Sequence, residues 1–154
     1  MSIFINNMLR IGLLNGPNLD RLGKREPEVY GSTTLSQIEE MVVAKAKSMD
    51  LEMDTYQSNH EGSMIDKIHE WADSEFKGLI LNPGGFTHTS IALRDAVVAS
   101  GLITIEVHLS NIHAREDFRH KSLISGASKA VIAGMGHWGY ISATDYLCEL
   151  HQSP

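Results

Sequence analysis

The chain has 154 residues, of which 42% are hydrophobic, and a formal net charge of −6 at pH 7. This length and apolar content predict one domain, residues 1–154, with a sizeable core. No apolar stretch approaches the roughly 20 residues that span a bilayer, and no secretory signal is expected at the N-terminus. The acidic balance argues against nucleic acid or an anionic membrane as partner.

The single cysteine, Cys148, excludes an intrachain disulfide and suits the reducing environment of the cytoplasm, where we expect the protein. It falls in a helical pattern near the C-terminus. A small packed hydrophobe is therefore a better interpretation of Cys148 than a nucleophile.

Apolar runs alternate with amphipathic stretches along the chain. A strand is predicted at residues 8–14 and is followed by the long polar segment 15–31. A helix is predicted over residues 33–49, with Thr34 and Gln37 forming a capping box at its start. Its core-facing side chains are expected to be Leu35, Ile38, Met41, Val42 and Met49.

The remaining sequence continues to alternate between strand and helix patterns, and Gly101 is placed to end one of the helices. The further predicted strands are residues 51–58, 78–82, 102–110 and 127–136, and the further predicted helices are residues 61–75, 89–101 and 139–150.

Five strands alternating with helices indicate an α/β fold with a parallel sheet covered on both faces. The expected fold class is flavodoxin-like, with strand order 2-1-3-4-5. Ligands in such sheets bind beyond the carboxyl ends of the strands, where the strand order reverses. Three polar segments are predicted to meet there: Asn15–Tyr30, Asn82–Ser90 and Glu106–His120.

The second polar segment begins with "NPGG", which marks a tight and irregular turn. Its glycines would let a ligand approach the backbone, and Asn82 would orient that ligand. The alternative is a strand-to-helix connection in which Asn82 bonds its own loop. His88 follows, just before a predicted helix, where a histidine can be structural or can bind a ligand.

The third segment contains "EVHLS", in which Glu106, His108 and Ser110 share one face of a strand. The Glu106 carboxylate can then orient the His108 imidazole and favour its protonated form, as an acid catalyst requires. A strand edge with solvated polar residues is the alternative, but it fits poorly with the apolar "LITI" that precedes it.

Arginines accompany both of the outer polar segments. Arg115 and Arg119 are four residues apart, suited either to an anionic ligand or to pairing with Glu116 and Asp117. In the first segment, Arg25 would favour the phenolate of Tyr30, whose ordinary pKa is about 10. A lid that excludes water would strengthen this effect. The alternative for Tyr30 is a half-buried loop anchor.

Three motifs, "NGPNLDRLGKREPEVYGSTT", "NPGGFTHTS-IALRDA" and "IEVHLSNIHAREDFRH", resemble those of the type II 3-dehydroquinate dehydratases in order and spacing. The resemblance extends from about residue 8 to about residue 150. It implies the flavodoxin-like fold, a homododecamer built as a tetramer of trimers, and conversion of 3-dehydroquinate to 3-dehydroshikimate by anti elimination through an enolate. It also implies no metal and no organic cofactor.

The resemblance also implies residue roles. Tyr30 would remove the C2 proton, Arg25 would hold it as a phenolate, and Asn18 would hold a water at the enolate. His108, oriented by Glu106, would protonate the departing C1 hydroxyl. The implied substrate-binding residues are Asn82, His88 and Arg119 for the ring hydroxyls, Ser110 and the backbone around Leu109 for the carboxylate, and Asp95, contributed to a neighbouring subunit.

The sequence itself gives a modest reason to expect an oligomer. Arg94 and Asp95 lie in the first turns of a helix whose apolar face packs on the sheet, so their charges are expected to point elsewhere. The "DRLGK" stretch, residues 20–24, varies among members of the family, which leaves the lid dynamics open. Use of the enzyme in shikimate biosynthesis or in quinate catabolism also stays open.

Other classes fit less well. A receiver module needs acidic residues where this chain has Asn15 and Asn82. A flavodoxin needs a hydroxyl- and glycine-rich phosphate loop after the first strand, whereas the loop here is long and charged. No convergent zinc ligand set is apparent among the eight histidines. No lysine follows a strand at its carboxyl end, which argues against a Schiff base. A catalytically silent assembly protein is the remaining alternative.

Overall fold

The computed structural model describes residues 8–24 and 26–153, with the side chains of residues 29 and 30 left out. Within this part of the chain, a five-stranded sheet has the order β2-β1-β3-β4-β5, and every neighbouring pair is parallel. The predicted flavodoxin-like order is therefore confirmed. The strands are β1 (Arg10–Asn15), β2 (Glu52–Gln57), β3 (Gly78–Asn82), β4 (Ile103–His108) and β5 (Ala130–Ala133).

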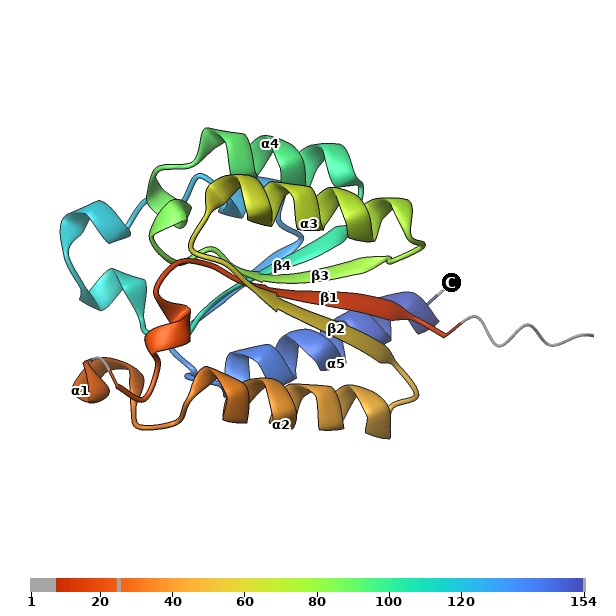
Figure 1. The fold of residues 1–154 in the computed structure, drawn as a ribbon, viewed down its shortest axis with the longest axis horizontal. Coiled ribbons are helices and arrows are strands. Elements are labelled where there is room, and N and C mark those ends of the chain that lie inside the picture. Colours follow the sequence, from red (N-terminus) through yellow and green to blue (C-terminus); the bar gives the residue numbers. More distant parts are fainter. Residues whose placement is uncertain (1–7, 25, 154) are drawn as a thin grey trace, which may run out of the picture.

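Four long helices cover the sheet, with α3 and α4 on one face and α2 and α5 on the other (Figure 1). Thr34 and Gln37 form the predicted capping box, and Gly101 ends a helix in the left-handed conformation, with φ 68°. The helices are α2 (Leu35–Ser48), α3 (Glu61–Asp73), α4 (Ile91–Ser100) and α5 (Trp138–Gln152).

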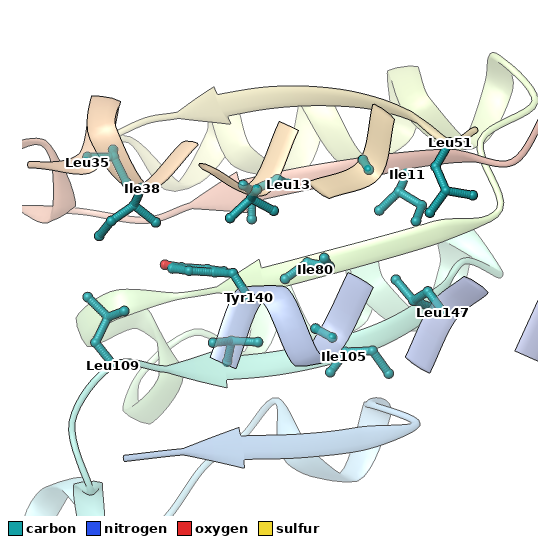
Figure 2. Packing of buried hydrophobic residues seen from close by; sticks show 14 of the residues in the cluster. Ile11, Leu13, Leu35, Ile38, Leu51, Ile80, Ile105, Leu109, Tyr140 and Leu147 are labelled. Atoms are coloured by element: carbon teal, nitrogen blue, oxygen red, sulfur yellow. The ribbon is translucent and has the colours of Figure 1, made fainter. Parts of the chain in front are cut away.

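The core has two layers because side chains on each strand alternate between the two faces of the sheet. On β1, Leu13 packs with the layer beneath α2 and α5, whereas Leu14 packs with the layer beneath α3 and α4. Figure 2 shows the first layer, including Leu13, Ile80 and Tyr140. Cys148 is buried in this layer as a packed hydrophobe, as predicted.

One prediction about the core was wrong. Met41 is 39% exposed, and Ala46 takes the core position instead. Successive helical residues are about 100° apart, so Met41 lies towards solvent because its neighbour Val42 is fully buried. Met49 does pack against the core, as expected.

Glycine at position 12 is required by close packing on the α3 face of the sheet. A Cβ atom there would lie 2.3 Å from the Trp71 ring. Trp71 is held in this place because its indole nitrogen donates to Asp54 Oδ2 on β2 at 2.8 Å. Any larger residue at position 12 would push α3 away from the sheet.

Most of the short helical turns gather at the carboxyl ends of the strands, at the left of Figure 1. All but the last of them fall in the three predicted polar segments, and the last lies between the third segment and β5. No helix in the described part of the chain is long and apolar enough to cross a membrane. The turns are η1 (Leu19–Arg21), α1 (Pro27–Tyr30), η2 (Gly84–His88), η3 (Ile112–Ala114), η4 (Asp117–Arg119) and η5 (Ser125–Ala127).

Candidate active site

A cleft of about 160 Å³ lies at the carboxyl ends of β1, β3 and β4. All three predicted polar segments contribute to its wall, which confirms that they converge. The lining residues are Pro17, Asn18, Leu19, Arg21, Leu22, Asn82, Gly84, Gly85, His88, His108, Leu109, Ser110, Ile112, Arg115 and Arg119.

The His108 imidazole, at the end of β4, forms part of the cleft wall. Its Nε2 donates to Glu106 Oε1 at 2.8 Å, so the predicted same-face pair is present. Glu106 is fully buried and His108 is 5% exposed. With Nε2 occupied by the carboxylate, Nδ1 is the ring nitrogen left for a ligand in the cleft.

Two serines that the sequence analysis did not single out also bind Glu106. Ser122 Oγ donates to Oε1 at 2.6 Å, and Ser125 Oγ donates to Oε2. Burial raises the pKa of the Glu106 carboxyl, but the hydrogen bonds from His108, Ser122 and Ser125 outweigh it, and the net effect lowers the pKa. The buried carboxylate is therefore ionised at neutral pH.

A buried hydrogen-bonded group lies behind Asn82 of the cleft wall, at the switch in strand order. Asn82 Nδ2 donates to the Tyr140 hydroxyl at 2.9 Å, and that hydroxyl donates to Asn15 Oδ1 at 2.5 Å. Figure 2 shows the Tyr140 hydroxyl pointing towards the carboxyl ends of the strands. Burial raises the pKa of Tyr140 above its usual value. Tyr140 therefore stays protonated and serves structure rather than base catalysis.

Asn82 also bonds its own loop, since its Oδ1 accepts from the Gly84 backbone at 3.2 Å. The alternative interpretation of "NPGG" is therefore confirmed. Asn82 also lines the cleft, and its orienting of a ligand stays a prediction. Gly84 has a φ of 58° and lies against the Pro17 carbonyl, where a Cβ would be 2.9 Å away. The glycine lets this turn close onto the loop after β1.

The orientation of the His88 ring is fixed by a hydrogen bond to a backbone carbonyl that does not line the cleft. Its Nδ1 lies 2.7 Å from the backbone carbonyl of Lys121, and a carbonyl only accepts, so Nδ1 carries the proton. The ring in its neutral form then presents Nε2 as an acceptor at the cleft. That arrangement suits a ligand hydroxyl.

The two arginines of the third segment enter the cleft from different places: Arg115 directly follows η3, and Arg119 ends η4. Arg115 donates to the Ser110 hydroxyl at 3.2 Å. Arg119 Nε pairs with Glu116, and this guanidinium lowers the pKa of the exposed Glu116 carboxyl. One arginine thus has the predicted carboxylate partner and still lines the cleft.

The loop after β1 is fixed by residues at and just after the end of β2, which the sequence did not single out. Asn59 Oδ1 accepts from the Asn18 backbone at 2.9 Å, and Gln57 Nε2 donates to the Gly16 carbonyl at 3.1 Å. Asn18 has a φ of 68°, a left-handed conformation in which asparagine is favoured over most residues. The signal was a fourth polar strand end, "QSNH", at the same edge of the sheet.

Two predicted catalytic groups lie outside what the structure describes. Arg25 is one, and the side chain of Tyr30 is the other; the backbone of Tyr30 ends α1. Their assignments stay predictions.

The two charges on α4 behave differently from each other. Asp95 is exposed and does not line the cleft. Arg94 points away from the sheet, as expected, but it stays on its own domain, because its Nη1 donates to the Leu123 carbonyl at 2.7 Å. The long Arg94 side chain reaches back to its own domain, whereas the short Asp95 side chain stays exposed.

The arrangement favours acid–base chemistry. Among the described residues, no group of three His, Cys, Asp or Glu side chains converges as metal ligands. The described wall of the cleft also holds no lysine. The fold and the cleft together define a flavodoxin-like domain with a carboxylate–histidine pair at the end of β4, beside the switch point of its sheet.

Comparison with known proteins identifies the family. The model of the family "Dehydroquinase class II" matches residues 9–148. The chain belongs to this family, the one that its three motifs resemble. A "3-dehydroquinate dehydratase 1" of Corynebacterium efficiens is 57% identical, with 92% of this chain and 93% of the relative covered. A "Catabolic 3-dehydroquinase" of Pyricularia oryzae is 51% identical, with 89% and 88% covered.

A solved structure agrees with this assignment. The type II dehydroquinase from Butyrivibrio crossotus superposes with a TM-score of 0.89 at 43% identity, covering 91% of this chain and 97% of that chain. The prediction of the family and of its fold is therefore confirmed.

Proposed function

We propose that this chain dehydrates 3-dehydroquinate to 3-dehydroshikimate as a type II hydro-lyase. The observation that carries the proposal is the buried Glu106–His108 pair at the cleft of a class II dehydroquinase fold. The substrate is a β-hydroxy ketone, which loses water when a base takes the α-proton and an acid serves the leaving hydroxyl. The cleft supplies such an acid.

The first step forms an enolate. Tyr30, as the phenolate held by Arg25, takes the proton from C2, and the electron pair of that bond moves to the C3 ketone oxygen. A water held by Asn18 stabilises the enolate oxygen, which is the charge that develops in this step. Support for Asn18 comes from its place in the cleft wall and from the bond between its backbone and Asn59.

The second step expels water. The enolate collapses to re-form the C3 carbonyl and makes the C1–C2 double bond, while the C1–O bond breaks. His108 gives a proton to the leaving hydroxyl, anti to the lost C2 hydrogen, and returns to its neutral form. Glu106 stabilises the protonated ring before this transfer, and the neutral ring keeps its Nε2 hydrogen, donated to Glu106, after it.

Substrate binding uses the rest of the wall. His88, with Nε2 as an acceptor, binds a ring hydroxyl together with Arg119 and Asn82. Ser110 and the backbone around Leu109 take the carboxylate, and Arg115 places the Ser110 hydroxyl. Neither a metal nor an organic cofactor takes part in these steps.

The proposed assembly is a homododecamer, a tetramer of trimers, in which Asp95 completes the site of a neighbouring subunit. The outer face of α4 supports this proposal. Ile91 and Val98 are 65% and 61% exposed, and they flank Asp95 at a helical spacing of four and three residues. Exposed apolar side chains around a carboxylate suit a subunit contact better than solvent.

The proposed setting is the cytoplasm, with the enzyme working in the shikimate pathway towards aromatic amino acids. Use of the same reaction in quinate catabolism is the second candidate, because one of the compared relatives carries a catabolic name. The chemistry of the cleft is the same in either role.

An absorbance assay for the conjugated enone product tests the function. Purified protein given 3-dehydroquinate should produce the enone, and borohydride should not inactivate it, because no Schiff base forms. Absence of enone would contradict the proposed function, and substrate-dependent inactivation by borohydride would contradict the mechanism.

A further inference from the structure

The segment Lys121–Ser125 bonds to η2 and to α4, although it does not line the cleft itself. The Lys121 carbonyl accepts from His88, and the Leu123 backbone donates to the Thr87 carbonyl at 2.8 Å. The Leu123 carbonyl accepts from Arg94 on α4. The segment is therefore anchored on both sides of Ser122, one of the two serines that bind Glu106.

The Ser122 hydroxyl has its direction fixed by the backbone. Its oxygen accepts from the Ile124 and Ser125 amides, each at 3.0 Å. A hydroxyl has two lone pairs and one proton, so both lone pairs are occupied. The single proton is then directed at Glu106 Oε1, which it reaches at 2.6 Å.

Ser125 has a simpler environment. Its hydroxyl donates to Glu106 Oε2, on the carboxylate oxygen that His108 does not use. Each oxygen of a fully buried carboxylate thus has a serine donor. In a water-excluded setting, such fixed donors hold a carboxylate both ionised and in one rotamer.

We propose that Ser125, supported by Ser122, is a positioning residue for the acid His108. Ser125 holds the Glu106 carboxylate in one rotamer. In that rotamer the carboxylate fixes the Nε2–H tautomer of His108 and leaves Nδ1 for the leaving hydroxyl. This role rests on the proposed dehydration. The serines touch neither substrate nor reacting atoms and act through Glu106. Among the described residues, the titratable group in contact with Glu106 is His108.

The test compares Ser125→Ala with Ser128→Ala in the full chain. Ser128 is a matched control, since it lies three residues after Ser125, is also half-buried and donates to the Ile124 carbonyl, at 3.0 Å, rather than to Glu106. Ser122→Ala is less suited, because it also removes the acceptor of two backbone amides. Ser125→Thr keeps a hydroxyl and serves as the rescue variant.

The first readout is ¹⁵N NMR of the His108 ring, assigned by the signal lost in His108→Gln. We expect the neutral ring to be the Nε2–H tautomer in the wild type, in Ser128→Ala and in Ser125→Thr, and a mixture of tautomers in Ser125→Ala. A merely structural serine would leave the tautomer unchanged. This measurement needs no substrate.

The second readout is kcat for enone formation. We expect Ser125→Ala to lower kcat about 10-fold with little change in KM, which is part of the about 10²–10⁴-fold that general acid catalysis contributes. In a Glu106→Gln background, the same substitution should have little further effect, because the two residues act as a unit.

The outcomes separate the two proposals. If the wild type forms no enone, the proposed function is wrong. If the wild type is active and Ser125→Ala matches Ser128→Ala in both kcat and tautomer, the role of Ser125 is wrong. A loss of kcat with an unchanged His108 tautomer, or an equal loss in the Glu106→Gln background, would also overturn it.

Discussion

Replacing Tyr140 with phenylalanine should destabilise the fold strongly although only one oxygen atom is removed. The ring can keep its packing between α5 and the sheet (Figure 2). Asn15 Oδ1 loses its donor and Asn82 Nδ2 loses its acceptor, and both groups are buried. A buried polar group left unpaired costs about 1–3 kcal/mol, so two of them cost about 2–6 kcal/mol.

Urea unfolding measures this loss. The whole domain is stable by about 5–15 kcal/mol, so the midpoint for Tyr140→Phe should fall clearly while the slope stays constant. Tyr146→Phe, on the same helix, is the control: Tyr146 is 38% exposed, and the change should stay within about 0.5 kcal/mol. Equal midpoints for the two variants would refute the role given to the buried hydroxyl.

The pH dependence of unfolding gives an independent check on Tyr140. Its pKa is raised in the folded protein, so the folded state favours the protonated phenol. The stabilisation is complete below the unfolded pKa of about 10 and declines as pH rises above it. The difference in unfolding free energy between wild type and Tyr140→Phe should therefore shrink above about pH 10. A difference that stays constant or grows there would contradict the raised pKa.

The remaining predictions concern the base, the carboxylate and the assembly. Tyr30→Phe should keep the fold by circular dichroism and lose most of the turnover; near-normal kcat would remove Tyr30 from the base role. The lowered pKa of Glu106 stabilises the folded state above the unfolded pKa of about 4.3, and this stabilisation is lost as pH falls through the folded pKa. The difference in unfolding free energy between wild type and Glu106→Gln should therefore narrow in acid. A difference that widens there would contradict the lowered pKa. Asp95→Asn should raise KM at least about threefold, because a cross-subunit hydrogen bond to a charged group is weakened. Light scattering should show twelve chains for the wild type. A fully active monomer would contradict both the stoichiometry and the role of Asp95.

The sequence could predict those features that depend on local pattern. Alternation along a strand placed Glu106 beside His108, and the succession of strands and helices gave the sheet order. The polar segments after β1, β3 and β4 were found because parallel strands end at one edge of the sheet. The geometry of the wall, however, depends on more distant partners.

Those partners were missed because their pairing is not encoded by spacing. Tyr140 and Asn15 are 125 positions apart, and Ser125 reaches Glu106 across 19. From sequence alone, a serine in a loop is expected to face solvent and a tyrosine in a helix to face solvent or pack in the core. Only the folded topology shows which distant polar group each one binds. Arg94 shows the same limit, since its helix position alone did not reveal the Leu123 carbonyl within its reach.

Partition of the enolate in His108→Gln tests the mechanism most directly. In deuterated water, C2 exchange reports enolate formation, and enone absorbance reports loss of the hydroxyl. If His108 is the acid, the variant should lose about 10²–10⁴-fold in elimination while C2 exchange remains detectable. Equal loss of exchange and elimination would contradict this assignment and would make His108 a substrate-positioning residue.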